Sequence, residues 1–477
     1  MAINSQQKHV LIILLILTIV ANPLIKLSES AAPAGTMFDL IHRNHLPVNQ
    51  NLTLAERVKQ MLHRDMIHVQ MVQTNYHNKQ QQSVGPAIEG EKVAVSPIRS
   101  GFSDSVGEYF VEIMVGTPPK KFLLVAATAS DLTWLDCNYK GINKNRNQKV
   151  VFDADNSKSF KTIDCSSTMC KNDLQALFSL PNQTCTHPKD GCHYDFGYGG
   201  TFAAAQGILA YETVTFNLLY GKTSAANNIL IGCTNSRRGL DSLLGPTGAT
   251  GIMGLSNSKF SLQNQASNLF GHTFSYCLVA FESHKTKSSK LIFGSPPQGT
   301  IKINGPMQHT KLELVNAAPS YGVYIKNIYV NGKLIIIPAS AWSFNSKGPG
   351  GTIIDSGSTS TSLIDSAYGP VINVLRNSMK SFKSVKGGPF ELCYAIKGFN
   401  ESAVPKVEIE FVGGARLGVA GKSYLLDSDD GSGKVIKCLT FIKAGSLNII
   451  GNLMQQNNLW EFDNKNAVLS FGSSSCT

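Results

Sequence analysis

The amino-acid sequence predicts an all-β protein built from two similar lobes. Short apolar or alternating runs, at 109–115, 122–125 and 213–216, are separated by Gly, Pro and Asn, which is typical of strands joined by turns. Beyond residue 95, no long run with helical spacing competes with them. One segment also occurs twice, once in each half of the chain. Such an internal repeat indicates two lobes of the same design.

The repeated segment is an apolar run that ends in a short polar turn. Residues 121–134 read KFLLVAATASDLTW, and residues 352–359 read TIIDSGST. Aligned on the apolar run, the turn positions correspond as follows: Ala127 with Asp355, Thr128 with Ser356, Ala129 with Gly357, and Ser130 with Ser358. Each half also has a later partner in which two apolar residues precede a glycine, GIMGL at 251–255 and IIGN at 449–452. One turn therefore carries a carboxylate where the other carries a methyl group.

These four elements, in this order, resemble those of the pepsin-like aspartic peptidases, and more narrowly their plant nepenthesin-type and nucellin-like branch. Three further stretches agree: VGTPP at 115–119, FSYCL at 274–278 and YGG at 198–200. The resemblance covers roughly residues 37 to 475. It implies a bilobal pepsin-like acid protease fold with a central cleft, and a family activity of acid endoproteolysis on extended peptides.

A pair of carboxylates would carry this chemistry. Two carboxylates within hydrogen-bonding reach cannot both ionise, so they share one proton and offer a general base and a general acid together. By resemblance, Asp355 is one member of the pair, while Ala127 leaves the other without a carboxylate. We therefore expect catalysis to be severely impaired. Ala129, where the second copy has Gly357, indicates that the first loop is no longer held to catalytic geometry.

The resemblance also assigns supporting roles next to the pair. Thr128 and Ser356 stand where the family's hydroxyls brace the two loops against each other. Ser130 and Ser358 stand where neighbouring hydroxyls orient the carboxylates by hydrogen bonding. These four residues complete the predicted site on the loops.

Two aromatic residues are expected at the flap that covers the cleft. Tyr198 matches the family's flap tyrosine, and Trp134 matches the tryptophan that usually backs it. Either could instead be an ordinary core aromatic. The flap also departs from the pattern, because this chain reads YGGTF where relatives commonly read YGDGS.

Two segments precede the predicted lobes. Residues 1–30 contain Lys8, an apolar run at 10–20 and small residues after it, which is typical of a secretory signal peptide and too short for a membrane span. Residues 31–95 are predicted to form a pro-segment that covers the cleft until it is cleaved. Thr53 and Glu56 form a capping-box signature before one amphipathic helix, and a Gln-rich linker follows. A permanent N-terminal helix is the alternative. The lobes are assigned to residues 96–300 and 301–477.

The cysteines indicate disulfides and an oxidising compartment. All ten lie beyond residue 130, and an even number in the mature part of a secreted chain is typical of a disulfide framework. The resemblance places a bridge between Cys393 and Cys438, while the pairing in the first lobe stays open. Glycosylation sequons begin at Asn51, Asn182 and Asn400. We expect a secreted glycoprotein of the extracellular space or cell wall, with the vacuole or chloroplast as alternatives.

Charge and motifs limit the partners. The net charge is +11, which suits a solvated surface or attraction to acidic wall polysaccharide. No interleaving of aromatic and basic residues supports nucleic-acid binding. There is no CxxC pair and no HExxH, so we expect neither a metal nor another cofactor. The expected partner is a peptide or protein in the cleft of a monomer, with no membrane attachment in the mature form.

Three functions are compatible with this sequence. The first is a peptide-binding protein that keeps the cleft and has lost the chemistry. The second is a working endopeptidase in which another carboxylate replaces the missing one. The third is a non-catalytic inhibitor or recognition protein, as in the xylanase-inhibitor relatives that share the fold. Composition does not separate these three.

Overall fold

Strands dominate the protein, and the all-β, two-lobed prediction is confirmed. The computed structural model describes residues 53–78, 92–100, 107–140, 150–175, 185, 191–198, 203–219, 221–244, 247–281, 289–297, 299–317, 319–344, 349–386 and 390–476. The predicted signal peptide, the sequons at Asn51 and Asn182 and the Gln-rich linker lie outside these residues. Within the described ranges, no helix is both long and apolar enough to cross a membrane.

Most strands belong to one hydrogen-bonded system that runs through both halves of the molecule. Its 20 strands are β1 (Ala94–Ser100), β2 (Tyr109–Val115), β3 (Lys120–Ala127), β4 (Trp134–Asn138), β5 (Phe152–Asp153), β6 (Lys161–Thr162), β7 (Cys192–Tyr198), β8 (Ala203–Asn217), β9 (Thr223–Arg238), β10 (Gly251–Gly254), β11 (Thr273–Cys277), β12 (Ser289–Phe293), β13 (Gln308–Glu313), β14 (Tyr321–Val323), β17 (Thr352–Ile354), β18 (Thr361–Ile364), β25 (Phe441–Ala444), β26 (Asn448–Ile450), β27 (Asn458–Asp463) and β28 (Val468–Ser473).

Two small sheets complete the C-terminal half. One is formed by β16 (Lys333–Ile335), β15 (Ile325–Val330), β21 (Val407–Phe411) and β22 (Arg416–Val419). The other is formed by β19 (Ser384–Val385), β20 (Cys393–Ala395), β24 (Val435–Leu439) and β23 (Leu425–Asp429).

Among the described residues, helices are few and mostly short. The α-helices are α2 (Leu54–Asn78), α4 (Asp241–Leu244), α5 (Leu262–Gln265), α6 (Ser267–Phe270), α7 (Asp365–Ser378) and α8 (Asn452–Gln455), and single turns form η2 (Ala154–Asn156), η3 (Met169–Leu174), η4 (Ala339–Ala341), η5 (Glu401–Ala403) and η6 (Gly421–Tyr424). Helix α7 is an exception to the expectation that no long helical period occurs beyond residue 95. Its buried side chains Ala367, Val371 and Leu375 recur every four residues and so face one side.

The two halves repeat one pattern of strand pairing. In the first half, β3 runs parallel to β10, β10 antiparallel to β4, and β4 parallel to β9. In the second half, β17 runs parallel to β26, β26 antiparallel to β18, and β18 parallel to β25. Strands β3 and β17 therefore lead into equivalent turns, 127–130 and 355–358, and the repeat seen in the sequence is a repeat of topology.

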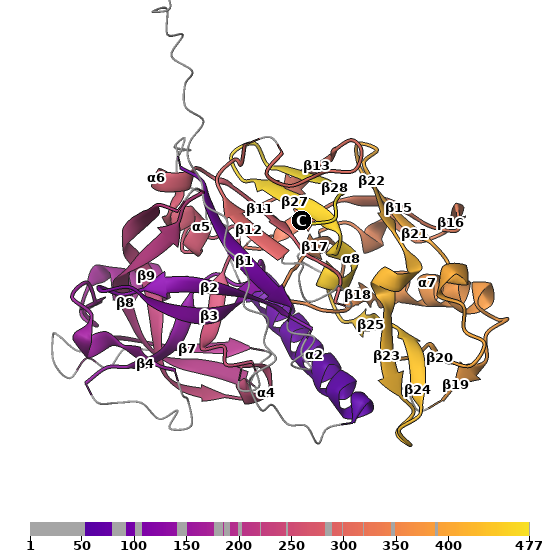
Figure 1. Cartoon of the computed structure of the whole chain (residues 1–477), viewed down its shortest axis with the longest axis horizontal. Helices are drawn as coiled ribbons and strands as arrows, with labels where there is room; N and C mark the ends of the chain where they lie inside the picture. Colours follow the sequence, from indigo (N-terminus) through magenta and orange to yellow (C-terminus); the bar gives the residue numbers. More distant parts are fainter. Residues whose placement is uncertain are drawn as a thin grey trace, which may run out of the picture.

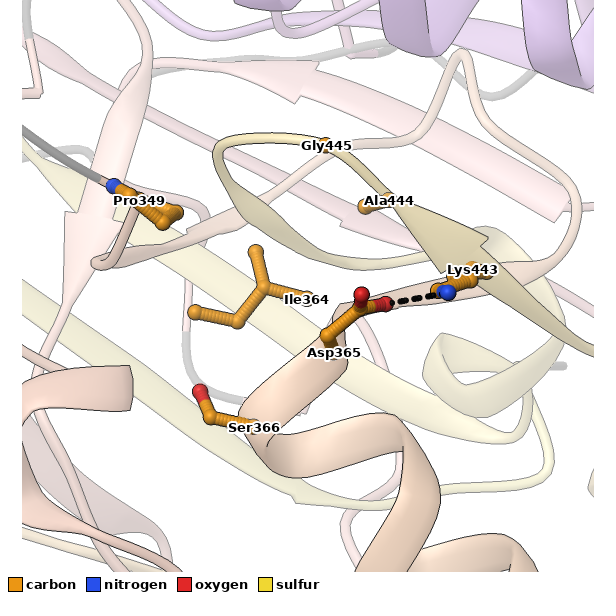
Figure 2. A pocket seen from close by; sticks show the side chains of 7 residues that line it. All are labelled: Pro349, Ile364, Asp365, Ser366, Lys443, Ala444 and Gly445. Carbon is orange, nitrogen blue, oxygen red and sulfur yellow. Dashed lines mark ion pairs between the residues drawn. The ribbon is translucent and has the colours of Figure 1, made fainter.

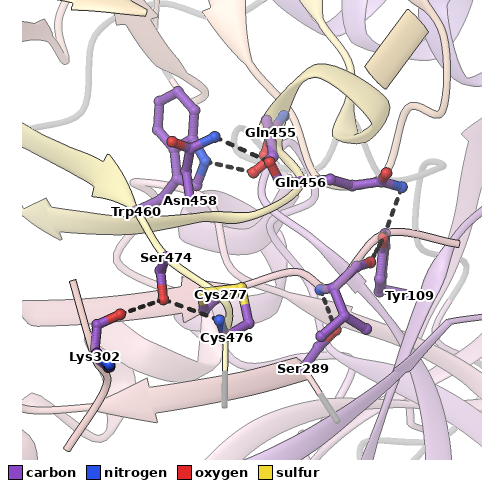
Figure 3. Close-up of a disulfide and its surroundings, with 11 residues drawn as sticks. Tyr109, Cys277, Ser289, Lys302, Gln455, Gln456, Asn458, Trp460, Ser474 and Cys476 are labelled. Atoms are coloured by element: carbon purple, nitrogen blue, oxygen red, sulfur yellow. Dashed lines mark hydrogen bonds between the residues drawn. A yellow bond between two sulfur atoms is a disulfide. The ribbon is translucent and has the colours of Figure 1, made fainter. Parts of the chain in front are cut away.

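A shared sheet and a disulfide join the halves. Strand β27 of the second half pairs with β11 of the first half. Within the first half, β1 pairs with β12 and β2. Figure 3 shows the Cys277–Cys476 disulfide, which fastens the chain's last residues to the end of β11. Strand β1 begins at Ala94, so it crosses the boundary predicted between residues 95 and 96.

The remaining disulfides lie within the halves. The structure pairs Cys393 with Cys438, as the resemblance implied, and the two residues face each other on β20 and β24. It also settles the pairing left open in the first half: Cys137 with Cys233, Cys165 with Cys185, and Cys170 with Cys192. The sequon residue Asn400 is exposed and caps η5 by accepting a hydrogen bond from the Ser402 N–H.

Helix α2 lies across the middle of the molecule. The predicted capping box begins it, because the Thr53 N–H donates to the Glu56 carboxylate at 2.7 Å and the Glu56 N–H donates to the Thr53 hydroxyl at 3.2 Å. The helix contacts β7 and α4 of the first half and β23 of the second (Figure 1). The segment predicted to cover a cleft thus bridges the two halves.

Candidate functional site

The turns that follow β3 and β17 brace each other reciprocally. The Thr128 N–H donates to the Ser356 hydroxyl at 3.2 Å, and the Ser356 N–H donates to the Thr128 hydroxyl at 2.9 Å. The Ser356 hydroxyl in turn donates to the Ala126 carbonyl at 2.9 Å, and the Thr128 hydroxyl donates to the Ile354 carbonyl at 3.3 Å. All these groups are buried, so the brace fixes the relative position of the two turns.

Asp355 is fully buried at the centre of this arrangement. The Gly357 N–H donates to its Oδ1 at 2.9 Å, and the Ser358 hydroxyl donates to its Oδ2 at 2.7 Å. His68 Nε2 lies 2.7 Å from the same Oδ2. Burial alone would raise the pKa of Asp355, but the charge of His68 and these hydrogen bonds hold it below its usual value. Asp355 is therefore an ionised carboxylate with a fixed orientation.

The equivalent position in the first turn has no acid. Ala127 is buried, and a Cβ built at Gly357 would lie 3.2 Å from the Ala127 Cβ, so the two turns face each other closely. Ser130 occupies the position equivalent to Ser358. Its hydroxyl oxygen is buried and has no hydrogen-bond partner among the residues that the structure describes. The first turn thus keeps the hydroxyl that would orient a carboxylate while lacking the carboxylate.

The pair Ala129 and Gly357 differs for a reason other than backbone angles. Gly357 does not adopt a positive φ, so its turn does not require glycine's conformational freedom. A Cβ at Gly357 would instead lie 3.0 Å from His68 Nε2. The absence of a side chain there leaves room for the imidazole beside Asp355.

The later repeat elements hold the second turn from behind. The Asn452 amide donates to the Ser356 carbonyl at 3.1 Å and to the Gly107 carbonyl at 2.9 Å. The Gln455 amide donates to the Asp355 carbonyl at 2.9 Å. These buried contacts explain why the IIGN element accompanies the DSGS turn.

Helix α2 places two polar side chains on the second turn. Asp65, which is 1% exposed, accepts hydrogen bonds from the Thr359 and Ser360 N–H groups, both at 2.7 Å. His68, one turn of helix further on, contacts Asp355. Burial would lower the pKa of His68, but the charge and hydrogen bond of Asp355 raise it above its usual value. The imidazole is therefore a cation paired with the one buried carboxylate of the turns.

A second charged pair lies next to this contact. Arg64 Nε is 3.8 Å from Glu108 Oε1, and both side chains are buried. Burial raises the pKa of Glu108 to about 7, although the charge of Arg64 opposes that rise. Burial also raises the pKa of Asp65, with the N–H groups of Thr359 and Ser360 partly offsetting it.

The predicted flap residues lie on the first half. Tyr198 ends β7 and pairs with Ala203 at the start of β8; its side chain and residues 199–202 lie outside the described part. Trp134 is fully buried at the start of β4, opposite Gly232. A Cβ at Gly232 would come within 2.9 Å of both Trp134 and Tyr194. Trp134 is therefore a core residue behind β7.

The sequence motifs assign no role to Arg64, Asp65, His68 or Glu108. A signal for two of them existed, because Asp65 and His68 fall on the same helical face as the buried Val58, Met61 and Val72. Polar residues on the apolar stripe of a helix need polar partners when that stripe is buried. The positions of Asp65 and His68 on the buried stripe indicate that each has a polar partner, but they do not identify that partner.

A separate surface cavity lies in the second half, at the start of α7 (Figure 2). It encloses about 490 Å³ and is lined by Pro349, Ile364, Asp365, Ser366, Lys443, Ala444 and Gly445. Asp365 and Lys443 are exposed and pair with each other at 2.8 Å. Because such exposed pairs interact weakly, this cavity provides no strong recognition element.

Two lobes of repeated topology that meet at cross-braced turns define the pepsin-like class of fold. Family models described as xylanase inhibitor N-terminal and C-terminal match residues 109–295 and 320–473. The chain is 30% identical to aspartyl protease family protein 2 of Arabidopsis thaliana, over 90% of this chain and 83% of the relative. It is 27% identical to nepenthesin-2 of Nepenthes gracilis, over 90% and 87% respectively. The chain belongs to the pepsin-like family of plant aspartic proteases.

Solved structures share the fold at lower identity. The crystal structure of edgp superposes with a TM-score of 0.64 at 20% identity, over 82% of this chain and 97% of that one. Basic 7S globulin from soybean superposes with a TM-score of 0.62 at 20% identity, over 80% and 96% respectively. At this identity the likeness concerns the fold alone.

Proposed function

We propose that this chain is a secreted member of the plant aspartic protease family whose cleft binds peptide and whose peptide-bond hydrolysis is severely impaired. The observation that carries the proposal is the contrast between Ser358, whose hydroxyl donates to Asp355, and Ser130, whose buried hydroxyl has no partner within the described residues. The scaffold for two carboxylates is present, and one carboxylate is missing. Asp355 is left without the acid that would share its proton.

The expected loss follows from counting catalytic roles. A lone carboxylate can act as base or as acid, but it does not supply both in one step. General acid–base help contributes roughly 10²- to 10⁴-fold per role. Residues that act as a unit lose more than the sum of their single contributions. In the turn that faces Asp355, the position equivalent to it holds Ala127, and the next acidic residue along that segment, Asp131, accepts a hydrogen bond from the Ser256 hydroxyl at 2.7 Å.

Secretion is supported by the cysteines. All ten are paired in five disulfides, and such bonds persist in oxidising compartments. Together with the signal-peptide pattern at residues 1–30, they favour the extracellular space or cell wall. In this proposal, the segment that carries α2 is the pro-segment, and the partner is a peptide or protein in the cleft of a monomer.

The test is an acid proteolysis assay on the purified protein with protein and extended peptide substrates. We expect no hydrolysis above the background of an Asp355→Ala control. Hydrolysis that Asp355→Ala abolishes would show that another carboxylate completes the pair, and the proposal would then be wrong. Capture of a transition-state-like peptide inhibitor, measured on the same samples, tests whether the cleft still binds peptide.

The position of α2 against Asp355, Thr359 and Ser360 favours a second candidate function. If α2 stays in place, recognition uses an outer surface instead, as in a non-catalytic inhibitor. The matched family models are described as xylanase inhibitor domains, which makes a xylanase the first target to try. Inhibition of xylanase by the intact protein, undiminished by Asp355→Ala, would support this function. The absence of inhibition at micromolar concentration would count against it.

A further inference from the structure

We infer that the cleft recognises an α-helix, that α2 is its resident ligand, and that α2 remains bound as a separate fragment after the chain is cut between residues 79 and 91. The ligand class is an amphipathic helix that presents an aspartate and, three residues later, a histidine. This inference rests on the proposed function, because it takes the cleft to be a peptide-binding site. It adds the conformation and chemistry of the peptide.

Two anchors on one helical turn define the recognition. The Asp65 carboxylate accepts from two successive N–H groups, those of Thr359 and Ser360. His68 pairs with Asp355, whose side chain is completely buried. Hydrogen bonds in which one partner is charged are about twice as strong as neutral ones. Both anchors contact the turn that retains its acid, and none of these contacts requires a carboxylate at position 127.

Apolar contacts seat the same face of the helix. Val58, Met61, Val69 and Val72 are each at most 5% exposed, and they lie on the side of α2 that carries Asp65 and His68. The helix contacts β7 and β23, so both halves of the molecule hold it. A site that buries four apolar side chains and provides partners for two polar ones has the composition of a binding site.

The spacing of the anchors selects a helix over a strand. Residues three apart on a helix lie on one face with their Cβ atoms about 5–6 Å apart. In an extended peptide, residues i and i+3 point to opposite faces and lie roughly 10 Å apart along the chain. An extended peptide with the same sequence would therefore reach either Asp355 or the Thr359 and Ser360 N–H groups, but not both.

The experiment uses the full chain with a specific protease site inserted between residues 80 and 85. The folded protein is cut and passed over a gel-filtration column, and the fraction of α2 fragment that co-elutes is measured. A labelled peptide covering residues 53–78 is then exchanged into the cut protein. We expect the fragment to co-elute at pH 6 and the peptide to exchange in with a measurable Kd.

Three variant peptides test the stated chemistry. His68→Ala should bind at least tenfold more weakly, since a hydrogen bond to a charged group is lost. His63→Ala, which changes an exposed histidine on the same helix, should bind like the unmodified peptide. Met66→Pro keeps both anchors but breaks the helix, because proline lacks the N–H and clashes with the preceding turn. It should bind at least tenfold more weakly as well.

Loss of the fragment on cutting, or binding of Met66→Pro or His68→Ala as tight as that of the unmodified peptide, would overturn the inference. Peptide hydrolysis is measured in the same samples. Hydrolysis would contradict the proposed loss of catalysis, but the binding of the variant peptides would still test whether the cleft recognises a helix. Fragment release without hydrolysis would contradict the helix inference alone.

Discussion

The turns at 127–130 and 355–358 follow strand pairs of the same topology and brace each other through Thr128 and Ser356. They differ in what lies inside the brace, where one turn has a buried carboxylate and the other a methyl group. Most of the bonds between the turns run from hydroxyls to backbone groups, and the Thr128 hydroxyl also lies 3.4 Å from Asp355 Oδ1. None of these bonds needs an acid at position 127, so the two turns keep their relative position with one carboxylate between them.

Restoring the missing acid gives the largest expected effect. In a cut chain that also carries His68→Ala, so that α2 leaves, Ala127→Asp should place a carboxylate within reach of Ser130 and beside Asp355. Acid peptide hydrolysis should then rise by roughly 10²-fold or more over the Ala127 protein, the lower end of what one general acid or base contributes. Initial rates on an extended fluorogenic peptide give the measurement.

Two controls make the comparison specific. Ala127→Asn introduces a side chain with the shape of aspartate but without its acid group, so the rate of peptide hydrolysis should not rise. Asp355→Asn added to Ala127→Asp should return the rate to background.

Adding Ala129→Gly to Ala127→Asp should raise the rate further if the first turn needs the room that Gly357 provides in the second. Equal rates for Ala127→Asp and Ala127→Asn would show that the two turns are not equivalent catalytic positions.

The pH dependence of α2 binding should be the next largest effect. The pKa of His68 is raised from 6.5, so its contribution is complete below that pH and is lost as the pH rises through the raised value. Buried Glu108, with its pKa raised from 4.5 to about 7, holds a proton in the docked state that the released state gives up, and buried Asp65 acts in the same direction above pH 3.8. Asp355, whose pKa is lowered, weakens docking only as the pH falls below 3.8 and through that lowered value.

Docking should therefore be tight near pH 5 and weaker at pH 8. Because each pKa unit is worth a factor of ten, Glu108 alone accounts for a change on the order of 10²-fold in affinity across pH 4.5 to 7. Retention of the cut fragment on gel filtration at pH 5, 6.5 and 8 measures it. Glu108→Gln should flatten the profile below pH 7. Tighter retention at pH 8 than at pH 5 would contradict the assignment.

Removing either hydroxyl of the shared brace should destabilise the protein to a similar extent. Thr128→Val and Ser356→Ala each leave a buried N–H of the opposite turn without its acceptor. Each should lower the free energy of unfolding by about 1–3 kcal/mol, the cost of an unsatisfied buried group. Urea denaturation measures both variants. A large effect in one turn alone would show that the brace is not reciprocal.

The smallest effect is expected where the turns differ. Ser358→Ala removes the hydroxyl that donates to Asp355 and should raise the pKa of that carboxyl and destabilise the protein. Ser130→Ala removes a buried hydroxyl that has no partner in the described structure, so the free energy of unfolding should change by no more than about 0.5 kcal/mol or should increase. Equal destabilisation by the two substitutions would mean that the Ser130 hydroxyl stabilises the fold as much as the Ser358 hydroxyl does, which would contradict the prediction.

Local patterns predicted much of this molecule. The alternation of apolar residues and turns gave the strands, the repeated turn gave the paired topology, and Thr53 with Glu56 gave the start of α2. The contact between His68 and Asp355 joins residues 287 positions apart. No periodicity encodes which distant group a polar side chain meets. The helical spacing of Asp65 and His68 with the apolar residues indicates buried polar groups, but only the folded chain identifies their partners as Thr359, Ser360 and Asp355.

Because of the Cys277–Cys476 bridge, the two halves of the molecule would respond differently to a pulling force (Figure 3). The bridge joins a first-half strand to Cys476, so tension applied to the chain outside these two cysteines passes through the sulfur atoms. The 199-residue separation between these cysteines then bears no load. At about 3.6 Å per residue, roughly 700 Å of chain stays hidden until the bridge is reduced. Asp355 and its turn lie within that hidden length, so tension on the chain would load α2 and the parts of the first half outside its own Cys137–Cys233 loop, while the segment that holds the carboxylate bears none.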